Sequence, residues 1–209
     1  MHVKGQELPM HDPRGKVAVG LSYATSESGA DHLTSYHDPS IANPESLSYK
    51  GAAPLGIDAP IAPRAFSRRT VLYYTLMEHW NSFGKTNGLC YFGPAPRSFI
   101  AVEEVVDAVN AASGWELSLA EMMRIGERAT NLARMFNARE GFTRKDDTLP
   151  ERLFQPLENG ALEGVAYPRD EFEAALTHLY DIKGWDTATG VPTREKLAEL
   201  GIEWAADLV

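Results

Sequence analysis

The chain has 209 residues and a formal net charge of −9 at pH 7, with 44% hydrophobic and 23% charged residues. These values are typical of a globular protein with one good core. The negative charge argues against a nucleic-acid-binding surface, because phosphate binding needs clustered Lys and Arg. No apolar run could span a bilayer, no signal-peptide core is recognised, and one cysteine gives no disulfide framework. We expect a cytoplasmic protein that binds neither membranes nor nucleic acids.

Residues 1–64 are expected to be a loop-rich segment, set apart by prolines and glycines. Continuous helix is not expected through the proline-rich parts, because Pro lacks a backbone donor and breaks helices. Residues 17–23 are apolar with small side chains, and residues 24–30 fit either a short helix or a turn. Long irregular segments in compact domains usually have a function. We therefore expect this segment to line a cofactor or to contact a further piece of protein.

Residues 65–209 follow a helical pattern, and no alternating strand pattern is recognised after residue 66. Ser118 and Glu121 form a capping box, and Gly114 and Gly184 stand where helix C-termini are expected. The predicted helices cover residues 68–80, 99–113, 119–139, 170–183 and 194–200. The charged residues 137–147 favour a solvated helix end with local ion pairs. This pattern predicts an all-α fold, an irregular multi-helix domain.

The only cysteine, Cys90, lies in the segment Gly84–Phe92, directly after a predicted helix. A lone cysteine is most often a small buried hydrophobe. The glycines at 84 and 88 favour a different interpretation, because they permit close approach of the main chain to a ligand. A thiolate presented there suits a soft metal or an iron–sulfur cluster. One cysteine cannot hold a cluster, so the partner ligands would lie outside this chain.

The histidines follow no zinc-binding pattern, and His32 and His37 are five residues apart, which does not place both on one helix face. By spacing alone, each histidine is expected at the surface or hydrogen-bonded in the core. His32 follows a run of small residues from which it could reach a ligand. Asp12–Gly15 favours a turn, and the alternative is that Arg14 and nearby amides hold an anion. No phosphate-binding loop or nucleophile elbow is present.

Several short segments in one order resemble the C-terminal portion of the tungsten-containing aldehyde:ferredoxin oxidoreductase family. They are Val3–Gly5, Asp12–Gly15, Gly20–Ser26, His32–Leu33, Gly88–Phe92, Phe136–Pro150, Gly184–Asp186 and Gly190–Thr193. Only residues 39–64 diverge, as an apparently longer loop. The match is specific because the segments extend over nearly the whole chain in the family's order.

The resemblance implies a tungsten (or molybdenum) bis-pterin cofactor and a nearby [4Fe–4S] cluster, which oxidise an aldehyde to a carboxylic acid and pass electrons to ferredoxin. Cys90 matches the family's fourth cluster ligand, and Gly88 and Leu89 match positions that lie against a pterin. His32 aligns with the family's active-site histidine, a proton donor or hydrogen-bond partner of the substrate oxygen. The residues expected along the cofactor pocket are Asp12, Arg14, Tyr23 and Thr25.

The chain also departs from the family. Lys85 stands at a cofactor-binding position where the family has Asp. The pterin-binding domain, the other three cluster cysteines and the active-site glutamate of the family are absent. The resemblance therefore predicts a part that is inactive without an N-terminal pterin-binding domain or subunit, and a homo-oligomer is possible. The alternatives are a cofactor-free structural or binding module, or a subunit of an aryl-acid or aryl-CoA reductase.

Overall fold

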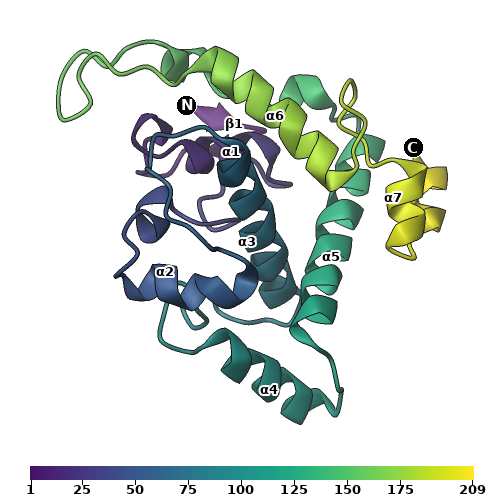
Figure 1. The fold of residues 1–209 in the computed structure, drawn as a ribbon. Helices are drawn as coiled ribbons and strands as arrows, with labels where there is room; N and C mark the ends of the chain where they lie inside the picture. Colours follow the sequence, from purple (N-terminus) through teal and green to yellow (C-terminus); the bar gives the residue numbers. More distant parts are fainter.

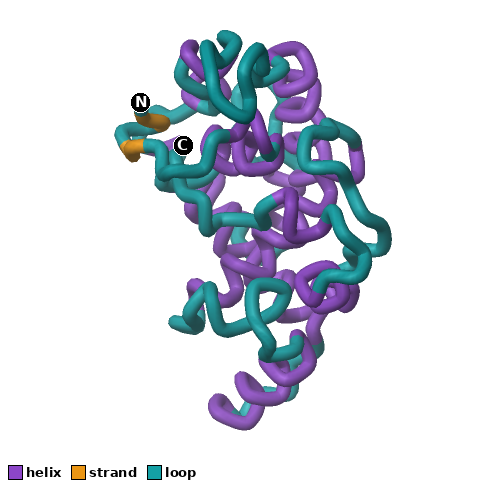
Figure 2. The backbone as a smooth tube through the Cα atoms, turned by 90° about the vertical axis from the view of Figure 1, so that its left-hand side faces the viewer, coloured by secondary structure: helices purple, strands orange, loops and turns teal.

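The computed structural model describes all residues 1–209 and shows a mainly helical chain (Figure 1, Figure 2). The α-helices are α1 (Val17–Thr25), α2 (Leu47–Ala52), α3 (Arg68–Thr86), α4 (Val102–Ser113), α5 (Leu119–Arg139), α6 (Arg169–Lys183) and α7 (Arg194–Glu199). Short 3-10 helices cover Pro13–Gly15, Asp38–Ile41, Ala53–Leu55, Arg144–Asp146, Glu151–Phe154 and Glu203–Leu208. The only sheet is an antiparallel pair, β1 (His2–Val3) and β2 (Gln6–Glu7). The predicted all-α fold is confirmed. None of the helices combines the length and apolar character that crossing a bilayer requires.

Local capping decides where the helices begin and end. Glu121 N–H donates to Oγ of Ser118 at 3.3 Å, and Ser118 N–H donates back to the Glu121 carboxylate at 2.8 Å. This capping box starts α5 at the predicted residue. Gly114 and Gly184 have φ angles of +74° and +66°, the left-handed conformation that ends α4 and α6. Helix α3 continues past its predicted end to Thr86.

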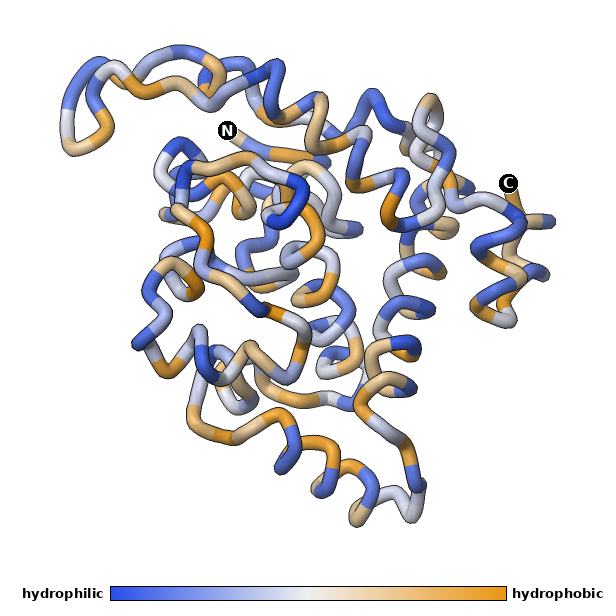
Figure 3. Tube along the Cα trace, viewed as in Figure 1, coloured by the Kyte–Doolittle hydropathy of each residue, from blue (hydrophilic) through white to orange (hydrophobic).

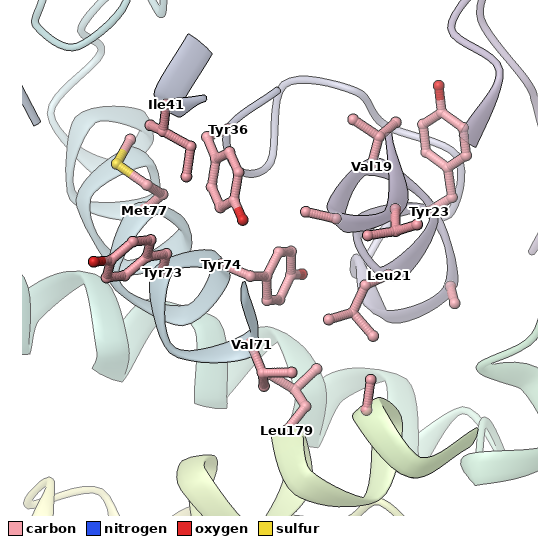
Figure 4. Close-up of a cluster of buried hydrophobic side chains, with 14 of the residues drawn as sticks. Val19, Leu21, Tyr23, Tyr36, Ile41, Val71, Tyr73, Tyr74, Met77 and Leu179 are labelled. Atoms are coloured by element: carbon pink, nitrogen blue, oxygen red, sulfur yellow. The ribbon is translucent and has the colours of Figure 1, made fainter. Parts of the chain in front are cut away.

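Helix α1 lies at the centre of the fold, and all nine of its residues are buried. Figure 4 shows Leu21 of α1 beside Tyr74 of α3 in the core. The hydroxyl of Tyr167 donates a 2.7 Å hydrogen bond to the carbonyl of Val17, against the side-chain-free surface of Gly20. Helix α1 ends at Thr25. Of residues 24–30, for which the sequence fitted a short helix or a turn, the first two end α1 and a turn follows.

One hydrophobic core joins the two predicted regions. A single cluster of 33 buried residues extends from Val3 to Trp185, across the predicted boundary at residue 64. Figure 3 shows hydrophobic stretches alternating with hydrophilic ones along the long helices and along the loop-rich segment. The division into residues 1–64 and 65–209 stays a prediction. The loop-rich segment nevertheless supplies part of the same core as the helices that follow it.

Helices α3 and α5 run side by side, as Figure 1 shows. They approach closely at Gly126 of α5, where a side chain would meet backbone atoms of His79 and Phe83. Phe136 continues the helical spacing of apolar residues Met122, Ile125, Ala129 and Leu132 on α5, yet it is 55% exposed. The buried face includes the polar Asn131, whose amide oxygen accepts a 2.8 Å hydrogen bond from the Trp185 indole. A hydrogen-bonded polar group can replace an apolar one in the core, which a hydrophobic pattern cannot detect.

The charged residues 137–147 are not wholly solvated, which corrects the sequence-based interpretation. The carboxylate of Asp147 is fully buried and pairs with Lys4 at 2.6 Å and with Arg134 at 2.7 Å. The Tyr180 hydroxyl donates to the same carboxylate. Lys4 Nζ also donates to the carbonyl of Ala24 at 2.7 Å, at the C-terminal end of α1. This buried network ties the N-terminal hairpin to α1, α5 and α6.

Candidate functional site

The imidazole rings of His11, His32 and His37 meet beside the N-terminus of α1. Ring centroids lie 4.8 Å apart for His11 and His32, 4.5 Å for His11 and His37, and 5.8 Å for His32 and His37. Lys16, the N-cap residue of α1, places its Nζ 2.9 Å from Nδ1 of His11 and 3.0 Å from Nδ1 of His37. Nε2 of His37 lies 3.0 Å from the carbonyl oxygen of His32. We call these four residues the histidine cluster.

Burial and nearby charge keep two rings of the cluster neutral. Burial and the positive charge of Lys16 lower the pKa of His37 to about 4. Burial also lowers the pKa of His11, and Lys16, His32 and Arg97 act in the same direction. The pKa of Lys16 is itself lowered by burial and by Arg97, against the opposing carboxylate of Asp38. At pH 7 we expect His11 and His37 to be neutral hydrogen-bonding groups.

Of the predicted pocket residues, Tyr23 contacts the cluster, and Asp12 and Arg14 lie next to it in the chain. The Tyr23 hydroxyl donates a 3.0 Å hydrogen bond to the carbonyl of His11, and burial raises the pKa of this phenol. Arg14 binds Asp12 with two parallel contacts, Nε to Oδ1 at 3.0 Å and Nη2 to Oδ2 at 2.7 Å. Its Nη1 donates to the carbonyl of Gln155 at 3.2 Å. The guanidinium of Arg14 is therefore occupied within the chain, and the turn predicted at Asp12 is a capped 3-10 helix.

The fourth predicted pocket residue, Thr25, lies in the core rather than in the cluster. Its hydroxyl donates to the carbonyl of Leu21 at 2.9 Å and is 2.9 Å from the Tyr74 hydroxyl. Tyr74 in turn donates to the buried carboxylate of Glu78 at 2.9 Å. Glu78 forms an ion pair with Lys183, whose ammonium lies over aromatic rings. These contacts join α1, α3 and α6, and a cofactor contact by Thr25 stays a prediction.

Cys90 lies in an exposed turn after α3 and lines a cavity of ≈ 240 Å³. Gly88 has a φ angle of +69°, so the turn uses the conformational freedom of glycine. Leu89 N–H donates to the carbonyl of Gly84 at 2.9 Å, which fixes the turn to the helix end. His37 lines the same cavity, so the cavity reaches from Cys90 to the histidine cluster. The apolar walls are formed by Leu33, Met77, Trp80, Phe83, Leu89 and Tyr91.

The donor set around Cys90 fits one ligand of a metal centre but no complete centre. The thiol is exposed, which rules out the alternative of a small buried hydrophobe. The chain has no group of three or more His, Cys, Asp or Glu side chains that could hold a metal ion. An iron–sulfur cluster bound by Cys90 would therefore take its other ligands from outside this chain.

Lys85 also lines the cavity and is paired with two acids. Its ammonium lies 3.4 Å from Oε1 of Glu27 and 3.4 Å from Oδ2 of Asp31. Burial lowers the pKa of Lys85, but the two carboxylates outweigh burial and raise it. The positive charge at this position is therefore balanced locally, and Asp31 presents a carboxylate to the same cavity.

Sequence reasoning singled out His32 and Cys90 but missed the other residues of the histidine cluster and the neighbouring Arg97. His11, Lys16 and Arg97 are separated along the chain and share no motif. The pair His32 and His37 was set aside because its spacing does not suit a helix. The two residues lie in a loop, where five-residue spacing brings the His37 ring back to the backbone of His32. A short polar loop between two histidines was the one signal available.

Comparisons with known proteins found a matching family, similar sequences and one similar fold. Residues 1–202 match the family model "Aldehyde ferredoxin oxidoreductase, domains 2 & 3". The chain is 35% identical over 205 residues to the tungsten-containing aldehyde ferredoxin oxidoreductase of Pyrococcus abyssi, a match that covers 97% of this chain and 31% of the relative. It is 26% identical to the aliphatic sulfonate oxidoreductase, WOR-like subunit, of Pyrococcus furiosus, over 97% of this chain and 28% of that relative.

A solved structure has a similar fold. The BamBC active-site complex of benzoyl coenzyme A reductase, bound to 1,5-dienoyl-CoA, matches with a TM-score of 0.64 and 20% sequence identity, over 97% of this chain and 32% of the other. The chain thus spans about a third of the length of the curated relatives it matches. By the family match over residues 1–202, the chain belongs to the aldehyde ferredoxin oxidoreductase family and corresponds to its domains 2 and 3.

Proposed function

We propose that this chain is the C-terminal part of an oxidoreductase with a tungsten (or molybdenum) bis-pterin and a [4Fe–4S] cluster. The complete enzyme oxidises an aldehyde to a carboxylic acid, RCHO + H₂O → RCOOH + 2H⁺ + 2e⁻, and ferredoxin accepts the electrons. The observation that carries the proposal is the placement of exposed Cys90 on the same cavity as His37, which contacts His32. The relatives' names supply the tungsten and the aldehyde.

The residues of this chain would have distinct roles. Cys90 supplies one thiolate to the cluster, on a turn that Gly88 and Leu89 hold against the end of α3. His32 holds a proton beside the reacting oxygen, and His37 fixes the His32 backbone. The apolar cavity walls exclude water from the neighbourhood. When bound, the metal centre supplies the two-electron chemistry and the cluster supplies one-electron transfer.

Exposed apolar side chains indicate where the N-terminal domain or subunit would dock. Met10, beside His11, is 100% exposed, Phe92, beside Cys90, is 54% exposed, and Phe99 is 90% exposed. Large apolar groups at the surface commonly mark interaction sites. Met10 and Phe92 lie within two residues of the predicted site residues Asp12 and Cys90. A partner that covers these two side chains would lie beside the candidate site.

The test is metal analysis of this chain purified anaerobically together with the N-terminal pterin-binding domain or subunit. Tungsten or molybdenum with about four irons per complex is expected for the wild type. Cys90→Ser should lower the iron content and alter the electron paramagnetic resonance signal of the cluster. Ser113→Ala, at an exposed position of α4, is the matched control and should change neither. Iron content and signal that are the same in Cys90→Ser and in the wild type would refute the proposal.

The same preparation separates the alternatives. A complex without iron or tungsten would favour a cofactor-free structural or binding module. A loaded complex that reduces an aryl-CoA ester, but oxidises no aldehyde, would favour the aryl-CoA reductase alternative, for which the solved structure shows similarity of fold.

A further inference from the structure

Lys16 restricts the tautomers of two imidazoles at once. An ammonium group carries only donors, so each ring nitrogen it contacts must be an acceptor. Lys16 Nζ contacts Nδ1 of His11 at 2.9 Å and Nδ1 of His37 at 3.0 Å. A neutral imidazole with an acceptor at Nδ1 carries its proton at Nε2. Both rings are thereby held as Nε2–H tautomers.

The two donors created in this way have different surroundings. The His37 ring is buried, and its Nε2–H donates to the carbonyl oxygen of His32 at 3.0 Å. That donor is already hydrogen-bonded within the chain, and it fixes the His32 backbone. The ring of His11 is only half-buried and makes no hydrogen bond other than the one from Lys16. Its Nε2–H remains available to a ligand.

His11 is also held rigidly next to His32. Its carbonyl accepts a 3.0 Å hydrogen bond from Tyr23, and its ring lies 4.8 Å from the His32 ring between centroids. A donor fixed at both its backbone and its ring loses little entropy on binding a ligand. The His11 ring is therefore a fixed donor directly beside the His32 ring.

Lys16 and Arg97 place positive charge near the pair, and the neighbouring carboxylates of Asp12 and Asp31 are already paired with Arg14 and Lys85. Lys16 and Arg97 both act on His11 by their positive charge, and both lower its pKa together with burial. His11 thus remains a neutral donor while the surrounding field attracts negative charge. The carboxylate facing Lys16 is that of Asp38, which is buried behind the cluster and accepts from the Ala18 backbone. A carboxylate is the ligand class that a neutral N–H donor beside two cations would bind.

We propose that Lys16 locks His11 as a second hydrogen-bond donor beside His32, and that the two rings together bind the carboxylate of a ligand. Lys16 is a positioning residue in this proposal, because it acts through His11. The inference deepens the proposed function, on which it rests for the role of His32 and for a carboxylic acid as product. It requires no metal or cofactor to be bound, so it can be tested on this chain alone.

The first measurement is the tautomeric state of the histidines in the ¹⁵N-labelled chain by imidazole NMR. His11 and His37 should both be Nε2–H tautomers in the wild type. In Lys16→Met they should become tautomer mixtures, and the pKa of His37 should rise from about 4 towards its ordinary value. The charged or titratable groups that face His37 are Lys16, His11, His32 and Arg97. Lys50→Met, which removes an exposed ion pair with Glu45, is the control and should change neither property.

The second measurement is binding of benzoate, with the neutral benzyl alcohol as the comparison probe. Benzoate should shift the resonances of His11 and His32, and His11→Phe should weaken its binding about tenfold, as expected for loss of one hydrogen bond to a charged group. Benzyl alcohol should bind no more weakly to His11→Phe than to the wild type.

Two results would overturn the proposal. If His11 in the wild-type chain is an Nδ1–H tautomer, Lys16 does not fix its tautomer, whatever the variants show. If the wild type and folded His11→Phe bind benzoate with equal affinity, His11 does not donate a hydrogen bond to the carboxylate. Failure of the proposed function would show instead in the metal analysis of the complex, while the tautomers and benzoate binding of this chain remained as described.

Discussion

The close contact between α5 and α3 at Gly126 offers a sharp test of the packing. Gly126 of α5 faces the backbone of α3. A Cβ atom added there would lie 2.7 Å from the carbonyl carbon of His79 and 3.0 Å from the amide nitrogen of Phe83, and closer still to the His79 oxygen. These are backbone atoms, so no side-chain rotation can relieve the overlap. Gly126→Ala must separate α3 from α5.

The magnitude follows from two opposing effects. Overpacking costs about 1–3 kcal/mol where side chains can adjust, and more where the obstacle is backbone. The better helix propensity of Ala offsets about 1 kcal/mol of this cost. We expect the free energy of unfolding to fall by about 2 kcal/mol or more, which lowers Tm by about 4–8 °C for a chain of this size. Urea unfolding followed by circular dichroism measures the change.

Gly84 provides a matched control on α3. A Cβ atom there would have Leu89 Cβ as its nearest neighbour, at an ordinary 3.8 Å. Gly84→Ala should raise the free energy of unfolding by about 0.5–1 kcal/mol, because Ala restricts the unfolded chain and favours helix. The reasoning would be refuted if Gly126→Ala were as stable as the wild type, or if both substitutions destabilised the chain equally.

Three further predictions concern charged side chains. Burial raises the pKa of Asp38 from its ordinary 3.8 to about 7 in the fold, so the wild type loses stability as pH rises between those values. Asp38→Asn removes this loss, and its free energy of unfolding should exceed that of the wild type by up to about 4 kcal/mol at the upper end of the window. Thermal unfolding from pH 4 to 8 measures the difference. Burial alone would raise the pKa of Asp147, but Lys4 and Arg134 lower it, so the ionised carboxylate stabilises the fold above pH 4 and this stabilisation is lost below. Asp147→Asn should lower the free energy of unfolding by about 3–5 kcal/mol at pH 7, and the gap to the wild type should shrink in acid. Lys85→Met should change stability by less than about 1 kcal/mol in urea, because its ion pairs are exposed.

The helical part of the fold could be predicted because its signals are local. Capping by Ser118 and a left-handed glycine at 184 act within one turn, so sequence alone locates the helix ends. The buried network of Asp147 could not be predicted, because its partner Lys4 lies 143 residues away. A charged run at a helix end has the same pattern whether or not one carboxylate is buried. Long-range ion pairs leave no periodic signal.

The residues of the candidate site also divide into those with a local sequence signal and those without one. Cys90 and His32 could be singled out because they stand in short motifs of the family, and their roles stay predictions. Lys16 was not found, because its role depends on two rings, those of His11 and His37, that only the folded chain brings to it. Arg14 shows the opposite problem, a residue whose sequence context indicated a role that its contacts do not favour. An anion-binding role was a reasonable alternative for an exposed arginine, but the side chain is buried and bound to Asp12.

The loop-rich segment carries both the core and the site, and this has a consequence for mutation. Lys16 is the N-cap residue of α1, whose residues are all buried, and its side chain holds the histidine cluster. Tyr23, on the same helix, supports His11. A change that displaces α1 must therefore move the two rings, and a change at the cluster acts on a helix packed at the centre of the fold. Substitutions such as Lys16→Met, which retain the aliphatic stem and remove only the charge, separate the two effects better than truncation to Ala.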